Sequence, residues 1–339
     1  MKQLNNIKQL NTGSLINNIK PRSLIISMSF TLLILTPVLI VKPNILLAER
    51  FFPGTGLIEI ILLVIYAGWL SQVMINAKNI SNIRTKYWFF FSVVFFTQFA
   101  LGLFVNDNFL MTGELHLPIP ALIVAAPVYR GEGFFMPILL ISTLALGGPA
   151  WCSSFCYIGS WDNLASLKRR PKKVNRKQTI IIRYLMIVLV VLVALILRYT
   201  GASLTVVIFF ALAFGLFGVF IMLYFSRKLG YMLHCTTYCP VGGVVTLLSK
   251  LYPVRMKIDL DTCTSCNICT THCKYDALSS DDIKSGKAGW NCTLCGDCIT
   301  SCHASSISFS FFGMKKDVWE IYMAIIVGLH AAFLALARL

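Results

Sequence analysis

The side chains best suited to chemistry in this 339-residue chain are its twelve cysteines, because every one belongs to a regularly spaced group. Eight lie in two similar runs, in which successive cysteines are separated by two, two and three residues. The first run contains Cys263, Cys266, Cys269 and Cys273, and the second contains Cys292, Cys295, Cys298 and Cys302. Four thiols within eleven residues are spaced too tightly for a disulfide framework, so they indicate metal ligation.

This spacing is that of bacterial two-cluster ferredoxins, where the fourth cysteine of each run ligates the other cluster. The sequence therefore predicts two [4Fe–4S] clusters. One cluster is expected to be bound by Cys263, Cys266, Cys269 and Cys302, and the other by Cys292, Cys295, Cys298 and Cys273. Structural zinc is the alternative, but zinc sites typically use two separated cysteine pairs around one ion, a pattern that is absent from both runs.

The remaining cysteines form two pairs, Cys152 with Cys156 and Cys235 with Cys239, each with a three-residue gap. Residues four apart in a helix share one face, and each pair follows an apolar run at the same expected edge of a membrane. The four thiols are therefore expected to converge, and the sequence predicts a third Fe–S cluster there. A redox-active dithiol, a Cu(I) site and buried structural thiols are the alternatives.

The rest of the chain has the composition of a membrane protein. It is 57% hydrophobic and only 13% charged, with a mean hydropathy of +0.73, so it lacks the polar surface of a soluble globule of its size. Six apolar runs are expected to span a bilayer, at residues 24–41, 56–75, 87–105, 133–148, 178–199 and 204–225. A seventh, at residues 318–337, contains Glu320 and His330, and an interfacial helix is the alternative there.

The charge distribution predicts the orientation of these helices. Lys and Arg outnumber Asp and Glu by 30 to 14, and they gather in the N-terminal tail and in alternate loops, whereas the loop of residues 106–132 is net acidic. The positive-inside rule therefore places the N-terminus and residues 226–316 in the cytoplasm of a prokaryote, beside its inner membrane. No nucleic-acid motif or cleavable signal peptide is evident, and the excess positive charge is explained by topology. The basic residues expected inside are Lys2, Lys8, Lys20, Arg22, Lys78, Arg84, Lys86, Lys168, Arg169, Arg170, Lys172, Lys173, Arg176, Lys177, Arg227 and Lys228.

These observations predict a mainly α fold, with six or seven transmembrane helices and a small α+β ferredoxin domain. The expected divisions are a cytoplasmic tail (1–23), a transmembrane domain with both C-x3-C pairs (24–258), a ferredoxin-like domain (259–312) and a terminal membrane helix (313–339). Strand-like stretches at 255–259 and 306–311 flank the two cysteine runs. The proline-rich apolar segment 117–128 is expected to be re-entrant or surface-lying, or else a packed loop.

The region after the sixth apolar run carries a family resemblance. It reads GYMLHCTTYCPVGGVVTLLSKLYPVRMKIDLDTCTSCNICTTHC. This resembles the membrane polyferredoxins that include NapH and NosR, which combine transmembrane helices, two C-x3-C-P motifs and a ferredoxin domain. The chain departs from the pattern at Tyr157, where proline is usual, and at Lys274 and His303, which replace the proline after each ferredoxin run. The resemblance implies electron transfer between the quinone pool or a cytoplasmic donor and a partner redox protein.

The function predicted is therefore that of an electron-transfer subunit in a membrane oxidoreductase complex. Its expected partners are other redox subunits, membrane lipid and the quinone pool, and substrate chemistry is expected to belong to a partner because no flavin or haem site is apparent. Four polar residues near apolar segments are candidates for contact with a quinone, namely Glu114, His116, Arg130 and His330. A copper-handling or oxidase-assembly factor that uses the C-x3-C thiols, and a redox sensor, are the alternative functions.

Overall fold

The computed structural model describes residues 19–41, 45–110, 117–172, 174–314 and 318–336. Within these ranges, six helical segments are long and apolar enough to cross a membrane, and they correspond to the six predicted runs. This confirms the predicted fold class, a multi-pass helical protein with a small two-stranded domain. The segments are Pro21–Leu39, Gly56–Ile75, Ile80–Phe104, Phe135–Phe155, Arg176–Tyr199 and Leu204–Leu229.

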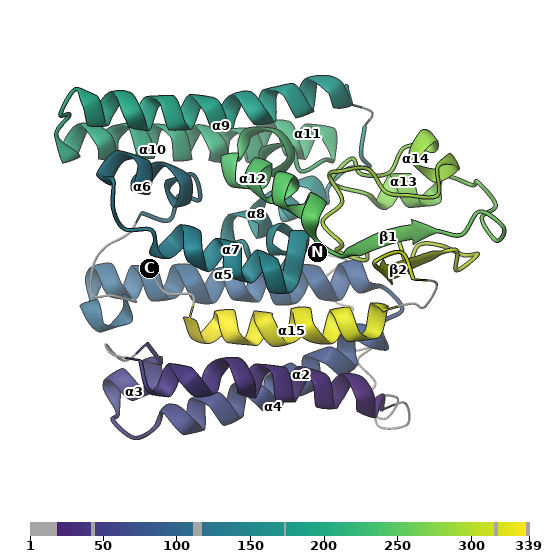
Figure 1. Ribbon diagram of the computed structural model, residues 1–339, viewed down its shortest axis with the longest axis horizontal. Helices are drawn as coiled ribbons and strands as arrows, with labels where there is room; N and C mark the ends of the chain where they lie inside the picture. The colour runs from purple at the N-terminus through teal and green to yellow at the C-terminus, as the bar shows by residue number, and fades with distance from the viewer. Residues whose placement is uncertain (1–18, 42–44, 111–116, 173, 315–317, 337–339) are drawn as a thin grey trace.

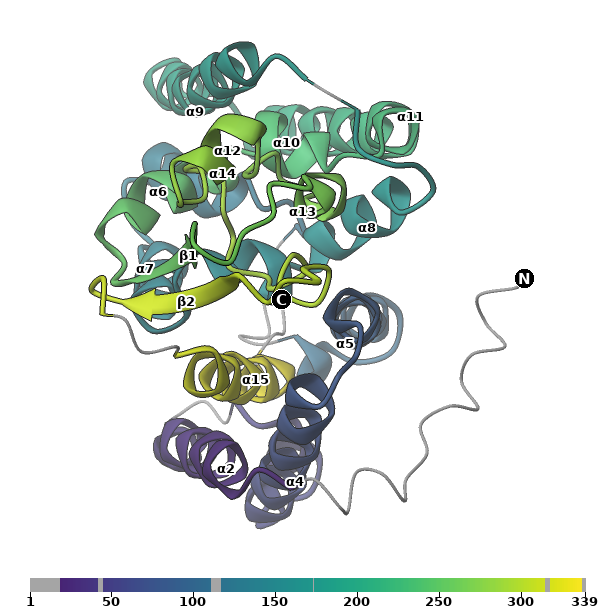
Figure 2. The ribbon, with the colours of Figure 1, turned by 90° about the vertical axis from the view of Figure 1, so that its right-hand side faces the viewer.

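The helices lie side by side in a bundle (Figure 1). Seen end-on, α2 (Pro21–Leu35) and α4 (Gly56–Ile75) form one edge, and α9 (Arg176–Tyr199) and α10 (Leu204–Phe220) form the other (Figure 2). Between them lie α5 (Ile80–Phe104) and α7 (Phe135–Gly147). Small residues allow close approach at one edge, where a Cβ added to Gly68 would lie 2.9 Å from Met28 Cγ.

The last apolar segment forms α15 (Trp319–Leu336), which packs along both α2 and α4. Most of its described side chains are buried, including His330 at 0% exposure. Its one acidic residue, Glu320, lies at its first turn and forms an ion pair with Lys20. A helix buried along its length belongs to the core of the bundle. Its apolar part, Trp319–Ala335, is shorter than the six candidate spans, so a seventh crossing of the membrane stays a prediction.

Several short helices connect the long ones. The proline-rich segment forms α6 (Leu122–Arg130), which packs against α9 at the end of the bundle away from the ferredoxin domain (Figure 1). Two others, α8 (Tyr157–Ser166) and α12 (Pro240–Leu248), directly follow the two C-x3-C pairs. The remaining short elements are α3 (Leu47–Phe51) and α11 (Arg227–Leu229).

The cysteine-rich domain sits at one end of the bundle (Figures 1 and 2). Its strands β1 (Val254–Ile258) and β2 (Ile307–Phe311) pair antiparallel, with Val254 opposite Phe311. Alternate residues of β1 are buried, as expected for a sheet with one face on a core. Two single-turn helices, α13 (Ile268–His272) and α14 (Ser280–Lys284), complete the domain, and a capping box of Ser279 and Asp282 begins α14.

Helix α5 begins seven residues before the apolar run that predicted it. The side chain of Asn79 accepts a hydrogen bond from Asn82 N at 3.2 Å and caps the extra turns. Arg84 therefore lies inside the helix and is fully buried. The charge pattern of the sequence predicts it instead among the basic residues of a solvated cytoplasmic loop. The carboxylate of Asp297 in the ferredoxin domain pairs with the Arg84 guanidinium and neutralises its charge, which allows the guanidinium to be buried.

Candidate functional site

The first cysteine set gathers around a hollow in the ferredoxin domain. Cys292, Cys295 and Cys298 of the second run line it together with Cys273 of the first run. Met256 of β1 and Phe309 of β2 close it with apolar side chains. The predicted exchange of the fourth cysteine is therefore present in the geometry on this side, and this set is named the inner set.

The second set contains the exposed Cys266 and is named the outer set. The electrostatic neighbours of the Cys269 thiol are Cys302, Cys266 and Cys263. The fourth cysteine of the second run, Cys302, therefore lies with the first three cysteines of the first run. Partial burial raises the pKa of the Cys269 thiol to about 11. Cys266 is the exposed member, whereas the other eleven cysteines of the chain are buried or half-buried.

The backbone repeats between the two runs. Ser265 and Asn267 flank Cys266 with φ of 55° and 57°, and Leu294 and Gly296 flank Cys295 with φ of 52° and 81°. A left-handed backbone conformation is energetically costly for every residue except glycine. Its recurrence at matching positions in both runs therefore indicates that the site requires this turn. Turns that alternate in this way aim successive N–H groups into one concavity, which favours an anionic occupant.

The two C-x3-C pairs also share one local structure. In each, a wide π-type turn spans the three intervening residues, over Trp151–Phe155 and His234–Tyr238. The second cysteine is then extended, with φ −76° and ψ 114° at Cys156 and φ −70° and ψ 118° at Cys239. A short helix starts directly afterwards, so each of these thiols lies at the positive end of a helix. We name these four cysteines the membrane-edge set.

A glycine three residues after the second cysteine permits this turn. Gly159 N donates to Cys156 Sγ at 3.4 Å, and Gly242 N donates to Cys239 Sγ in the matching position. A Cβ added to Gly159 would lie 3.1 Å from Cys152 O, and one added to Gly242 would lie 2.5 Å from Cys235 O. The repeat is therefore C-x3-C-x2-G, which is visible in the sequence and was missed there.

The four membrane-edge thiols lie close enough to influence one another electrostatically. The Cys235 thiol lies within electrostatic range of Cys152, Cys156 and Cys239. Its pKa is raised mainly by burial, and the negative charges of Asp162 and of these three thiols raise it further. Burial likewise raises the pKa of Cys156 to about 12. Thiols in such surroundings stay protonated unless a cation replaces the protons, which is what metal ligation does. A buried carboxylate supports the loop, since Asp162 Oδ2 accepts from Cys235 N at 3.0 Å.

Single metal ions and iron–sulfur clusters require different arrangements of thiols. Among the described residues, no group of three or more Cys, His, Asp or Glu side chains surrounds the position of a single ion. Thiolates on a cubane each bind a different iron, so they surround a larger space than the four ligands of one zinc or Cu(I) ion do. The two ferredoxin runs carry the cysteine spacing of such clusters, and a centre on the membrane-edge set stays a prediction.

The inner set and the membrane-edge set are neighbours. A hollow between them is lined by Cys152 and Cys235 on one side and Cys292 on the other. Tyr275 Oη donates to Cys152 O at 3.4 Å, and Ser153 Oγ donates to Thr293 O at 3.2 Å. Apart from this hollow, the residues around the two sets pack into one hydrophobic core.

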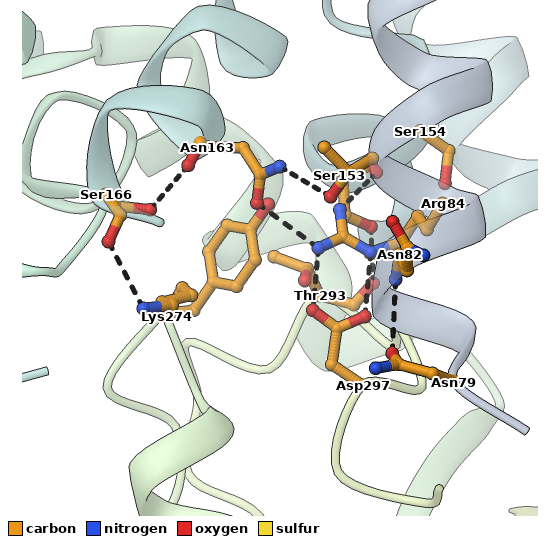
Figure 3. Close-up of polar contacts among 12 residues, drawn as sticks. Asn79, Asn82, Arg84, Ser153, Ser154, Asn163, Ser166, Lys274, Thr293 and Asp297 are labelled. Atoms are coloured by element: carbon orange, nitrogen blue, oxygen red, sulfur yellow. Dashed lines mark hydrogen bonds and ion pairs between the residues drawn. The ribbon is translucent and has the colours of Figure 1, made fainter. Parts of the chain in front are cut away.

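A buried ion pair fastens the two domains at this junction (Figure 3). Arg84 Nε and Nη2 donate to the two carboxylate oxygens of Asp297 at 2.9 and 2.6 Å. Arg84 Nη1 donates to Ser153 O at 3.0 Å, and Nη2 also reaches Asn163 Oδ1 at 3.3 Å. One side chain of α5 thus holds the loop between Cys295 and Cys298 and the loop between Cys152 and Cys156.

The lysine that departs from the ferredoxin pattern forms a second fastening. Lys274 Nζ donates to the carbonyl oxygens of Ser166, Arg169 and Gly230 at 3.0–3.2 Å. The first two of these belong to the end of α8 and the loop after it, and the last follows α11. Proline has no such donor, so the replacement after Cys273 ties the ferredoxin domain to the base of the bundle.

Two iron–sulfur domain families match this chain. A 4Fe-4S dicluster domain matches residues 255–303, which contain all eight cysteines of the outer and inner sets. A 4Fe-4S binding domain matches residues 129–176, which contain Cys152 and Cys156. The chain is therefore an iron–sulfur protein with candidate membrane-spanning helices, and electron transport is the role that these domains support.

The wider comparisons are sparse. An uncharacterized protein of Methanocaldococcus jannaschii is 26% identical over 157 residues, which are 43% of this chain and 59% of that protein. The chain thus spans about three fifths of the length of the curated relative it matches. No solved structure matches it. None of these matches names NapH or NosR, so that resemblance stays a prediction.

Of the four candidate quinone residues, the structure describes two, Arg130 and His330. Glu114 and His116 lie outside the described residues. Arg130 is exposed at the end of α6, whereas His330 is buried against Tyr87, with ring centroids 4.6 Å apart, and its Nδ1 lies 3.4 Å from Ser154 O. A quinone contact therefore stays an untested prediction for each of them.

Proposed function

We propose that this protein passes electrons between a soluble cytoplasmic carrier or a quinone and a partner redox protein, as the iron–sulfur subunit of a membrane complex. Two [4Fe–4S] clusters in the ferredoxin domain and a third Fe–S centre on the membrane-edge set would carry the electrons. Bound clusters supply one-electron redox chemistry, and the protein supplies their ligands, spacing and surroundings.

One observation carries the proposal, which is the order of the three cysteine sets. The outer set exposes Cys266 to solvent, the inner set is enclosed by the sheet, and the membrane-edge set shares a hollow with Cys292 of the inner set. An electron arriving at the outer set would therefore reach the membrane-edge set in two transfers, by way of the inner set. A storage or purely structural role would not require the three sets to follow one another in this order from solvent to membrane.

The residues between the sets have supporting roles in this scheme. Tyr275 lies between Cys152 and the inner set, and its hydroxyl donates to the carbonyl oxygen of Cys152. The Arg84–Asp297 pair holds the cysteine-bearing loops of the inner and membrane-edge sets at a fixed position relative to one another. Fixed spacing and a dry surrounding are what a chain of clusters requires from its protein, because solvent exposure and hydrogen bonds to sulfur set cluster potentials.

The cytoplasmic side of the ferredoxin domain belongs to the proposal. The beginnings of α2, α5 and α9 lie at the same end of the bundle as the domain (Figure 1). The basic residues Lys168, Arg169, Arg170 and Lys172 precede α9, and Arg176 and Lys177 begin α9 at that end. The positive-inside rule favours the cytoplasm for this end and hence a cytoplasmic carrier as the partner of Cys266.

Anaerobically purified protein in detergent tests the proposal by iron analysis and EPR during reductive titration. We expect about twelve irons per chain, about four for each centre. Cys156→Ala and Cys239→Ala should each remove the same EPR signal and about four irons, while the ferredoxin signals remain. Bound zinc with no reducible paramagnet would contradict the whole proposal, and full iron content in both variants would contradict the third centre alone.

A further inference from the structure

Among the residues that the structure describes, two arginines are buried in the long helices of the bundle, and only Arg84 forms an ion pair. Arg84 pairs with Asp297, as described above. Arg183, in the middle part of α9, is 2% exposed and forms no ion pair with any acidic side chain that the structure describes. A buried guanidinium without a negative partner is strongly unfavourable, so its presence needs an explanation.

The hydrogen bonds of Arg183 go to uncharged acceptors, so they do not neutralise its positive charge. Its Nε donates to Thr236 O, and its Nη1 donates to Thr246 Oγ1 at 3.0 Å and to Asn291 Oδ1 at 2.9 Å. All three acceptors are neutral. The buried carboxylate of Asp162 accepts instead from Cys235 N. The carboxylate of Asp276 lies within electrostatic range of Arg183, but it is only partly buried and forms its ion pair with Arg176.

The surroundings of Arg183 collect donors and thiols. It lines the hollow that also contains Cys152, Cys235 and Cys292, and none of the described residues lining this hollow is Asp or Glu. Asn291 Nδ2 and Thr293 Oγ1 line the same hollow and have no hydrogen-bond partner, although both residues are more than nine-tenths buried. Three groups able to donate, one of them charged, therefore converge on a space bounded by cysteines.

The thiols that influence Arg183 identify which centre it serves. Cys152 and Cys239 lie within electrostatic range of its guanidinium, one from each C-x3-C pair, and both belong to the membrane-edge set. Four thiolates carry more negative charge than the iron–sulfide core they bind carries positive charge, and reduction adds a further electron. A cluster on this set would supply the negative charge that Arg183 lacks.

We propose that Arg183 is the counter-ion of a net-negative Fe–S centre held by Cys152, Cys156, Cys235 and Cys239, an inference that rests on the third centre of the proposed function. The fixed positive charge stabilises the reduced state more than the oxidised state, because the reduced centre is more negative. Arg183 therefore raises the midpoint potential of the membrane-edge centre and makes it able to accept an electron from the inner set. Asn291 and Thr293 add neutral donors from the inner-set loop.

EPR-monitored redox titration of the full-length protein tests the proposal with Arg183→Gln and Arg183→Lys. We expect Arg183→Gln to shift the midpoint potential of the membrane-edge centre to more negative values, so that its reduced fraction at a fixed solution potential falls several-fold. Arg183→Lys should shift it less, and the two ferredoxin signals should not move. Arg198→Gln, at the other end of the same helix, is the matched control and should change none of the three.

A second measurement keeps the proposal testable if Arg183→Gln assembles poorly. In the wild-type background Arg183→Met should lower the apparent unfolding temperature, whereas in the Cys156→Ala background it should leave that temperature unchanged or raise it, because the charge it removes has lost its partner. Equal effects in both backgrounds, or an unmoved potential with full iron content, overturn the role of Arg183. A wild-type protein that lacks the third signal overturns the third centre as well, while the electron-transfer function of the ferredoxin domain would stand.

Discussion

Arg84 of a membrane helix and Asp297 of the ferredoxin domain, 213 residues apart in sequence, form a two-pronged ion pair with almost no solvent exposure. Asp297 lies between two cysteines of the inner set, and Arg84 also binds the carbonyl of Ser153 between two cysteines of the membrane-edge set. The pair therefore fixes how the two candidate centres sit relative to one another. Its charges are neutralised by each other, so either residue alone would be a buried, unpaired ion.

The first prediction is that Asp297→Asn strongly destabilises the junction. The variant leaves the Arg84 guanidinium buried without a counter-charge, which costs about 3–5 kcal/mol in comparable pairs. We expect a lower apparent unfolding temperature and loss of the inner-set EPR signal before the outer-set signal during gentle heating. Differential scanning fluorimetry in detergent and EPR of the heated samples measure both effects.

The matched control is Asp276→Asn, which removes a carboxylate from the half-exposed pair with Arg176. Partly solvated pairs contribute only about 0–1 kcal/mol, so this variant should behave almost as wild type. If both variants lowered the unfolding temperature equally, burial of the Arg84 pair would not be the reason for its importance.

The second prediction concerns the exchange of fourth cysteines. Because Cys273 shares a hollow with Cys292, Cys295 and Cys298, removing it should damage the same cluster as removing Cys295. The double variant Cys273→Ser with Cys295→Ser should therefore lose about four irons, no more than either single variant. Iron content and EPR of the anaerobically purified variants measure the loss.

The contrasting double variant is Cys273→Ser with Cys266→Ser, which removes one ligand from each ferredoxin cluster. It should lose about eight irons. If instead this pair lost about four and the first pair about eight, each run would bind its own cluster and the exchange would be wrong.

The fold could be predicted from the sequence because each of its signals is local. Apolar runs of sufficient length are enough to indicate helices such as Gly56–Ile75, which begins and ends where its run does. Cysteine spacing likewise indicates the ferredoxin repeat without any knowledge of contacts. The start of α5 was mispredicted because its first turns are polar and are buried only by contact with a distant domain.

The supporting residues of the site could not be found in the same way. Nothing near Arg84 in sequence indicates Asp297, and nothing near Lys274 indicates the three carbonyls that it binds. Arg183 did carry a signal, since a charge inside an apolar run is a functional candidate. The shared glycine of the two C-x3-C-x2-G motifs was also visible, but its purpose depends on a backbone approach that only the fold reveals.

The third prediction concerns membrane topology. Arg170 is exposed in the basic loop before α9, and Asp107 is exposed in the acidic loop after α5. A cysteine-reactive, membrane-impermeant label should reach Asp107→Cys from outside intact cells, but reach Arg170→Cys only after lysis. Labelling in the reverse order would overturn the proposed orientation, and with it the cytoplasmic carrier.

The last prediction is that Gly242→Ala prevents assembly of the membrane-edge centre while the ferredoxin clusters remain. The added methyl group would lie 2.5 Å from Cys235 O, a backbone atom that cannot move aside as a flexible side chain can. The turn must then widen, which separates Cys239 Sγ from the N–H groups at the start of α12 and from the other three thiols. We expect a loss of about four irons and of one EPR signal, the same signal that Cys239→Ala removes.

Gly215→Ala on α10 is the control for this last variant, because its added methyl group would meet only the end of the Ile119 side chain, at 3.1 Å. That side chain can adjust, so iron content and all signals should match wild type. Gly159→Ala tests the symmetry of the two motifs. Its Cβ would lie 3.1 Å from Cys152 O and 2.7 Å from the Trp88 ring, and it should remove the same signal as Gly242→Ala. If the two glycine variants affected different signals, the two pairs would belong to separate sites, and a single centre shared by all four thiols would be excluded.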